Sequence, residues 1–324
     1  MKKLLFLLGA LSVVSTVTYS EVNLWESENF IGTSMGYTGF EIAGKYYNRS
    51  IKNVNEDQRF LNEVYAVKRT INENLKEKAM ADTQEKNWIL NADVDYLKYE
   101  DLSTSIYNLS YAVLSDVTRY GINVSMFDGD TEIESKEYDS KGYQVNLFFN
   151  RNEDLGNLFG TLYIGKNEKN LDGLDIDNLY YGYFTSLEQK YESFDLDEFY
   201  SGYFLNLDIS RTEADYKPLD VKKVSKDNDS IDSELGILFE KKMTVGMDNE
   251  VSVKLTSSIG KEFKEEDKYK DLGKDEFEFY NRNRLEITTN IGTGANIFAG
   301  AEYRKSLTTS NSDKNLYIGF RINF

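Results

Sequence analysis

The side chains best suited to chemistry lie near the C-terminal end of the chain, where charged residues alternate with apolar ones. Successive side chains of a β-strand point to opposite faces, so charged residues at alternate positions share one face. The set comprises Glu278, Arg282, Arg284, Glu286, Glu302, Arg304 and Arg321. Such a cluster either forms a structural network of ion pairs or lines a charged constriction that selects solutes.

The composition excludes most catalytic chemistry. The chain of 324 residues contains no His and no Cys, which rules out imidazole and thiol catalysis, ordinary zinc sites and disulfide bonds. The acidic runs Asp128–Glu132 and Asp172–Asp177 lack the glycine and glutamate spacing of a defined calcium loop. We therefore expect no enzymatic activity, no metal and no cofactor, and we interpret the acidic runs as solvated loops.

The N-terminus has the pattern of a secretory signal peptide. Lys2 and Lys3 precede an apolar run, and small residues lead to an expected cleavage site after Ser20. The formal net charge of −17 becomes −17 − 2 = −19 once these lysines are removed. An acidic surface of this kind repels nucleic acid, so we expect no nucleic-acid partner.

A helix is predicted at residues 56–86. This stretch has no Gly or Pro, and its apolar residues recur at spacings of three and four, which is typical of a narrow helical stripe. The stripe consists of Phe60, Val64, Val67, Ile71 and Leu75. The helix either occupies the lumen of a barrel or lies outside it. Residues 21–55 form a short preceding segment, in which residues 30–47 have the character of one or two extra strands.

From Trp88 to the last residue the pattern predicts an all-β fold of twelve antiparallel strands. In the last strand, Leu316, Ile318, Phe320 and Phe324 share one face and polar residues the other. The expected strands are 88–99, 103–116, 119–128, 141–151, 157–168, 178–190, 198–211, 231–242, 249–263, 275–290, 295–306 and 315–324.

The connections between these strands favour a transmembrane β-barrel over a soluble sandwich. Short turns alternate with longer acidic connections such as 129–140 and 212–230, as in outer-membrane barrels. Apart from the signal peptide, no apolar run approaches the length of a spanning helix, whereas most strands are long enough to cross hydrocarbon. Charged side chains are costly on the lipid face, so the charged cluster is placed in the lumen. Asn281 and Asn283 then point outward, unless a bulge shifts the register.

The region 56–324 resembles the translocator β-domain of bacterial autotransporters (type V secretion). The resemblance rests on the helix before Trp88, the twelve strands, and the segments Gly142–Leu147, Leu158–Gly165 and Phe298–Tyr303 with the terminal strand. It implies an outer-membrane barrel with a helix through its pore. It also implies that the terminal strand is recognised by the barrel-assembly machinery, through Tyr317, Phe320, Ile322 and Phe324.

The expected organisation is a signal peptide at 1–20, a short segment at 21–55, a helix at 56–86 and a barrel at 87–324. Residues 21–55 are too few for a passenger of ordinary size, so we expect the protein to anchor or translocate its own N-terminal segment. We also expect it to be a monomer. Its partners would be outer-membrane lipids and the secretion and assembly machinery. The alternatives are a small passive porin and a surface adhesin or scaffold that binds an unidentified host ligand through its long loops.

Overall fold

A computed structural model describes the helix and the barrel that follows it. It covers residues 50–323 apart from 82–87, 100–101, 116, 134–135, 154–155, 172–173, 194–196, 219–223, 246–248, 267–278, 291–294 and 309–311. The predicted signal peptide, the strand-like stretch at 30–47, Glu278 and Phe324 lie outside these residues.

Twelve antiparallel strands form a closed barrel, as predicted, in which each strand pairs with its sequence neighbours and β1 pairs with β12. The strands are β1 (Trp88–Tyr99), β2 (Leu102–Ser115), β3 (Thr118–Ile133), β4 (Lys136–Glu153), β5 (Gly156–Leu171), β6 (Leu174–Glu192), β7 (Phe199–Pro218), β8 (Val224–Val245), β9 (Asn249–Glu266), β10 (Phe279–Asn290), β11 (Ala295–Ser306) and β12 (Ser312–Asn323). Closure leaves no free sheet edge along the paired registers.

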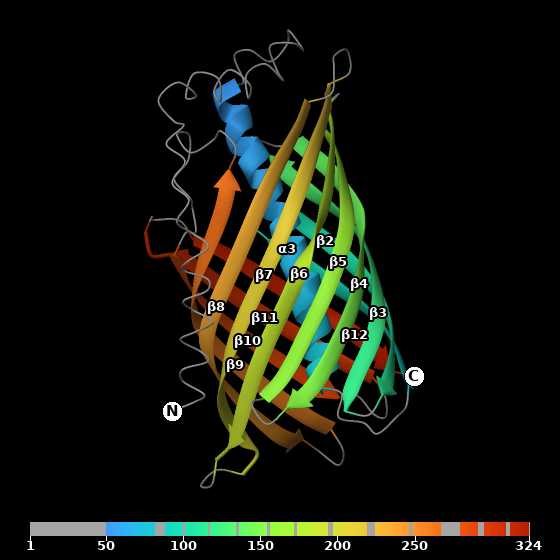
Figure 1. Ribbon diagram of the computed structural model, residues 1–324, viewed down its shortest axis with the longest axis vertical. Helices are drawn as coiled ribbons and strands as arrows, with labels where there is room; N and C mark the ends of the chain where they lie inside the picture. Colours follow the sequence, from blue (N-terminus) through green and yellow to red (C-terminus); the bar gives the residue numbers. More distant parts are fainter. Residues whose placement is uncertain are drawn as a thin grey trace.

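Helix α3 (Ser50–Ala81) runs through the barrel along its length (Figure 1). It begins at Ser50 rather than at residue 56, and the side chain of Phe60 is not among those described. Its C-terminal end lies at the end of the barrel where β1 begins, and its N-terminal end lies at the opposite end (Figure 1).

The alternation of side chains follows the prediction. On the outer face, Leu147, Leu162 and Ile259 are 58%, 59% and 60% exposed. On the inner face, Gln144 and Asn146 are fully buried although they are polar. The barrel is thus apolar outside and polar inside, as a lipid exterior and a hydrated or protein-filled lumen require.

The predicted long acidic loops are wrong: most of their residues belong to strands. β3 continues to Ile133 and β4 starts at Lys136, which leaves only 134–135 of the predicted loop 129–140 between them. β7 and β8 likewise take up most of 212–230, and 219–223 lie between them. The apolar alternation stops in these segments, but the backbone pairing continues, so polarity does not mark the strand end.

Asn281 and Asn283 do point outward, without a bulge. The pairing of β10 with β9 and β11 is continuous through both residues. Asn283 Nδ2 donates to Asn281 Oδ1 at 2.6 Å, and Asn281 Nδ2 donates to the carbonyl of Ser258 at 2.9 Å. The two amides satisfy one another and the backbone, which lowers the cost of their position.

Several aromatic rings on the inner wall lie over glycines of the adjacent strand. The ring of Tyr317 lies where a Cβ atom on Gly300 would be, and the ring of Phe298 covers Gly319 in the same way. Both rings are buried against the helix. Glycine is required at these positions because any side chain would collide with the ring.

Candidate functional site

The candidate site is the lumen, which α3 fills. Between Glu63 and Ala79 every side chain of the helix is buried except those of Tyr65, Arg69 and Glu77, which are half-buried. A helix that is polar on all sides is usually solvated. Here the inner wall supplies the polar partners that water would otherwise provide.

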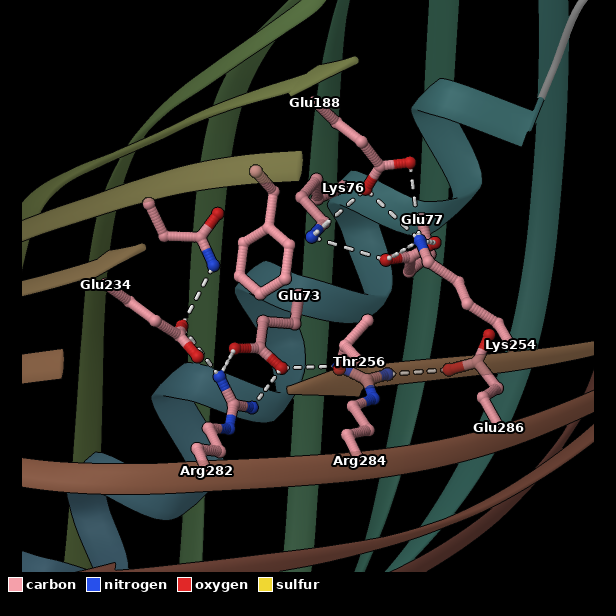
Figure 2. A pocket seen from close by; sticks show the side chains of 12 residues that line it. Glu73, Lys76, Glu77, Glu188, Glu234, Lys254, Thr256, Arg282, Arg284 and Glu286 are labelled. Atoms are coloured by element: carbon pink, nitrogen blue, oxygen red, sulfur yellow. Dashed lines mark hydrogen bonds and ion pairs between the residues drawn. The ribbon is translucent and has the colours of Figure 1, made fainter. Parts of the chain in front are cut away.

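Glu73 occupies the centre of the lumen and is held by two arginines of β10 (Figure 2). Arg282 donates from Nη1 to Glu73 Oε1 at 2.5 Å and from Nη2 to Oε2 at 2.6 Å. Arg284 Nη1 donates to Glu73 Oε2 at 2.5 Å. Paired donors of this kind are among the strongest and most directional contacts available to a carboxylate.

The two arginines also bind carboxylates of the barrel wall. Arg282 contacts Glu234 of β8 at 3.1 Å and Glu302 of β11 at 2.5 Å. Arg284 contacts Glu286 at 2.7 Å, and its Nε donates to the hydroxyl of Tyr317 at 2.6 Å. One helix carboxylate is therefore tied to four strands through a single network.

The predicted charged residues are not all in this network. The structure brings together Arg282, Arg284, Glu286 and Glu302. Arg304 pairs separately with Glu262 at 2.9 Å and lies over the ring of Tyr280. Arg321 lies over the ring of Phe298, with its guanidinium carbon 5.2 Å from the ring centre.

A second charged network joins the next turn of the helix to β6 and β9. Lys254 Nζ lies 2.9 Å from Glu77 and 3.1 Å from Glu188. Lys76 lies 3.3 Å from Glu77 and 4.0 Å from Glu188. Figure 2 shows both networks on one side of the helix.

Further contacts hold the helix at other heights and on other sides. Glu63 pairs with Lys169 of β5, and Lys68 lies 3.0 Å from Asp208 of β7. Lys78 pairs with Asp93 of β1. The amide oxygen of Asn72 accepts hydrogen bonds from Gln144 at 2.8 Å and Asn146 at 2.9 Å, both on β4.

The four members of the predicted apolar stripe whose side chains are described are buried in the lumen in two separate clusters. Val67 and Ile71 pack with residues of β1, β2, β3, β11 and β12, among them Leu97 and Phe127. Val64 and Leu75 pack with β2, β4, β5 and β6, among them Phe159. The stripe therefore contributes hydrophobic burial in addition to the charged contacts.

The helix lies closer to one side of the barrel. Its backbone approaches β1, β3, β4 and β5 most closely; we call strands β1–β5 the near wall and β6–β10 the far wall. A narrow cleft with a cavity volume of about 20 Å³ lies between α3 and the far wall. Its lining is made up of Glu73, Lys76, Glu77, Glu188, Phe204, Asn206, Glu234, Lys254, Thr256, Arg282, Arg284 and Glu286.

Sequence reasoning identified two wall partners of the arginines, Glu286 and Glu302, but missed Glu73 and Glu234, and it missed Lys254 of the second network. Glu73 lies on the helix outside the apolar stripe. The signal was present, since Glu234 alternates with the outward residues Leu235 and Ile237, and Lys254 precedes the outward Leu255. Which inward charge meets which helix residue depends on strand tilt and helix rotation, and sequence spacing does not give these.

The described residues contain no cluster of three or more acidic side chains arranged to hold a metal ion. None of the helices described is both long enough and apolar enough to cross a bilayer.

Neither family models nor curated proteins match this sequence. Solved structures do. The β-domain of the Bordetella autotransporter BrkA is 15% identical, with a TM-score of 0.52 over 73% of this chain and 98% of its own. The translocator domain of the autotransporter NalP from Neisseria meningitidis is 11% identical, with a TM-score of 0.51 over 80% of this chain and 98% of its own. The predicted resemblance is thus confirmed at the level of the fold: the chain forms a closed barrel similar to those of these autotransporter domains.

Proposed function

We propose that this protein resides in the outer membrane and holds the chain upstream of Ser50 at the cell surface, with α3 as the segment that remains in the pore. The observation that carries the proposal is a continuous helix inside a closed barrel, with Glu73 bound to two arginines of the wall. Charged residues on both the helix and the wall are buried together, and each set compensates the desolvation of the other.

The same lumen argues against a passive porin. A porin needs an open aqueous channel, whereas the helix side chains from Glu63 to Ala79 are buried or half-buried against the wall. The adhesin alternative relied on long loops at 129–140 and 212–230, and most of those residues are in strands. The role we propose is structural and needs no catalytic group.

The partners in this proposal follow from the two surfaces of the barrel. The exposed apolar outer face contacts membrane lipids. The outward side chains of Phe320 and Ile322 on β12, which are 43% and 37% exposed, are proposed as the part of the terminal strand that the barrel-assembly machinery recognises. Tyr317 points into the lumen and is better suited to hold Arg284.

Single-channel conductance tests the position of the helix. We expect the refolded mature protein to conduct little, and a version lacking residues 21–86 to open large, steady channels. Equal, large currents from both proteins would contradict the proposal and favour a porin.

Surface exposure tests the direction of the chain. An epitope placed before Ser50 should be accessible to antibody and removable by added protease on intact cells, while α3 stays protected. An epitope that becomes accessible only after the outer membrane is broken would contradict surface display.

A further inference from the structure

The charged residues of α3 follow a regular spacing that the apolar stripe does not share. Glu63, Lys68, Glu73 and Lys78 recur every five residues and alternate in sign. Five residues of α-helix advance about 7.5 Å along the axis and about 140° around it beyond a full turn. Successive members therefore lie at different heights and face different strands.

Each of these residues meets an opposite charge on the wall. Glu63 pairs with Lys169, and Lys68 with Asp208. Glu73 pairs with Arg282 and Arg284, and Lys78 with Asp93. The partners lie on β5, β7, β10 and β1 in turn, so the contacts wind around the lumen as the helix descends. We call these four helix residues and their partners the charge ladder.

The alternation matters when the helix is displaced by five residues along its own screw. If each residue moved to the place of the one five positions ahead, Glu63 would meet Asp208, Lys68 would meet the two arginines, and Glu73 would meet Asp93. Displacement the other way sets Lys68 against Lys169, Glu73 against Asp208, and Lys78 against the arginines. Each of these contacts brings like charges together in a buried lumen, which is strongly unfavourable.

Other displacements are disfavoured in a different way. A shift of three or four residues separates all four charges from their present partners, and only one of the four then meets a new opposite charge: Glu73 beside Lys254 in one direction, or Lys78 beside Asp95 in the other. A shift of five does bring Arg69 to Asp95, but that single attraction stands against three repulsions. Only the observed register pairs every member of the ladder.

We propose that the charge ladder is a register code, which stops the helix at one axial position in the lumen. Glu63, Lys68, Glu73 and Lys78 are then positioning residues that determine where the chain halts, and not only how firmly it is held. The proposal rests on the proposed function, because it assumes that α3 is the segment retained in the pore.

Disulfide cross-linking between helix and wall measures the register directly. Because the chain has no native cysteine, only the two introduced cysteines can form the bond. N72C paired with N146C reports the native register, since these side chains are in hydrogen-bond contact. V67C or E77C paired with N146C reports a displacement of five residues in one direction or the other. In an otherwise unchanged chain we expect a disulfide-linked product from the pair 72/146 and none from 67/146 or 77/146. These are called the products at 72, 67 and 77.

Inverting the ladder should move the helix. With E63K, K68E, E73K and K78E combined, the native register becomes repulsive at every step and a five-residue displacement becomes attractive. We expect the product at 72 to fall at least about tenfold and a product to appear at 67 or 77. The matched control, with Gln at all four positions, should give products at more than one position, because it removes the code without inverting it.

Two results overturn the register code. One is an inverted variant that keeps the product at 72. The other is loss of that product with none gained at 67 or 77, which would mean that the charges only stabilise the helix. If no position couples to N146C in the unmodified background, the helix is not lodged in the lumen and the proposed function fails as well.

A smaller variant decides the matter if the inverted chain does not form a barrel, as judged by its heat-dependent migration on gels. E63K alone should lower the product at 72 about tenfold, and E63K with K169E should restore it. Lack of rescue in a folded barrel would overturn the proposal.

Discussion

The near and far walls of the lumen hold the same helix by different means. Against the near wall, Val67, Ile71 and Leu75 pack closely with aromatic and aliphatic side chains. Against the far wall, long charged side chains such as those of Arg282 and Lys254 bridge a cleft. Apolar packing tolerates small shifts along the axis, whereas paired charges do not. The near wall therefore supplies most of the burial, and the far wall, together with the near-wall ion pairs of Glu63 and Lys78, supplies position.

The largest loss of helix-docking free energy is expected from a substitution at the far wall. Arg282→Gln would leave Glu73, Glu234 and Glu302 without their shared cation in a buried site, at a cost of about 3–5 kcal/mol in helix docking. Conductance measures this loss as an increased fraction of time in the open state. Arg211→Gln is the control: Arg211 points outward, is 39% exposed and contacts Asp229 at 3.8 Å, so its cost should stay below about 1 kcal/mol. Equal effects of the two variants would refute the ranking.

The second-largest loss of helix-docking free energy is expected at the near wall. Ile71 is 2% exposed, and Ile71→Ala would leave a cavity and lose hydrophobic burial, at a cost of about 2–4 kcal/mol in helix docking. The same conductance assay applies. Met80, which packs only partly against the neighbouring cluster, serves as the control, and Met80→Ala should cost less. A larger effect at Met80 would mean that the cluster around Ile71 is not what holds this side.

A smaller effect is expected for the amide contacts of the near wall. Asn146 donates to Asn72 and to Thr161. Asn146→Ala removes one of the two hydrogen bonds that Asn72 accepts and the one that Thr161 accepts, at a cost of about 1–2 kcal/mol. Asn206 faces the cleft, where water can replace its bond to Glu234, so Asn206→Ala should cost less than about 1 kcal/mol. A reversal of this order would show that the cleft is dry.

The least perturbing experiment uses single cysteines at the same two positions. N206C, beside the cleft, should react with a small water-soluble thiol reagent at least about ten times faster than N146C, which is packed under the helix. The rates are measured on the folded protein by mass shift. Equal fast rates would indicate that the helix leaves the lumen readily, and equal slow rates that the cleft is closed.

The sequence predicted the barrel well because one physical rule governs it. Leu316, Ile318 and Phe320 face outward and Asn315 and Tyr317 inward, as alternation requires. The same rule failed at the ends of β3 and β7, where the sequence has no apolar alternation although the strand pairing continues. The helix start was wrong for a related reason: Ile51 and Val54 are the only apolar residues between Ser50 and Asn55, and two residues are too few to mark a helical stripe.

The site was predicted only in part. Arg282, Arg284, Glu286 and Glu302 were identified, because their charge can be placed only in the lumen. Glu73 was not, because its role depends on a partner more than two hundred positions away along the chain. Pairing across a lumen is a property of the assembled barrel, and local spacing contains no information about it.

The glycines under the aromatic rings set the bore of this barrel. Twelve strands fix the circumference of the wall, but the free width inside depends on how far the rings stand out from it. At Gly300 and Gly319 the rings of Tyr317 and Phe298 lie flat against the sheet, and a methyl group there would swing them toward the axis. The calibre of the passage, and hence the size of the segment that can rest in it, is determined by residues that have no side chain.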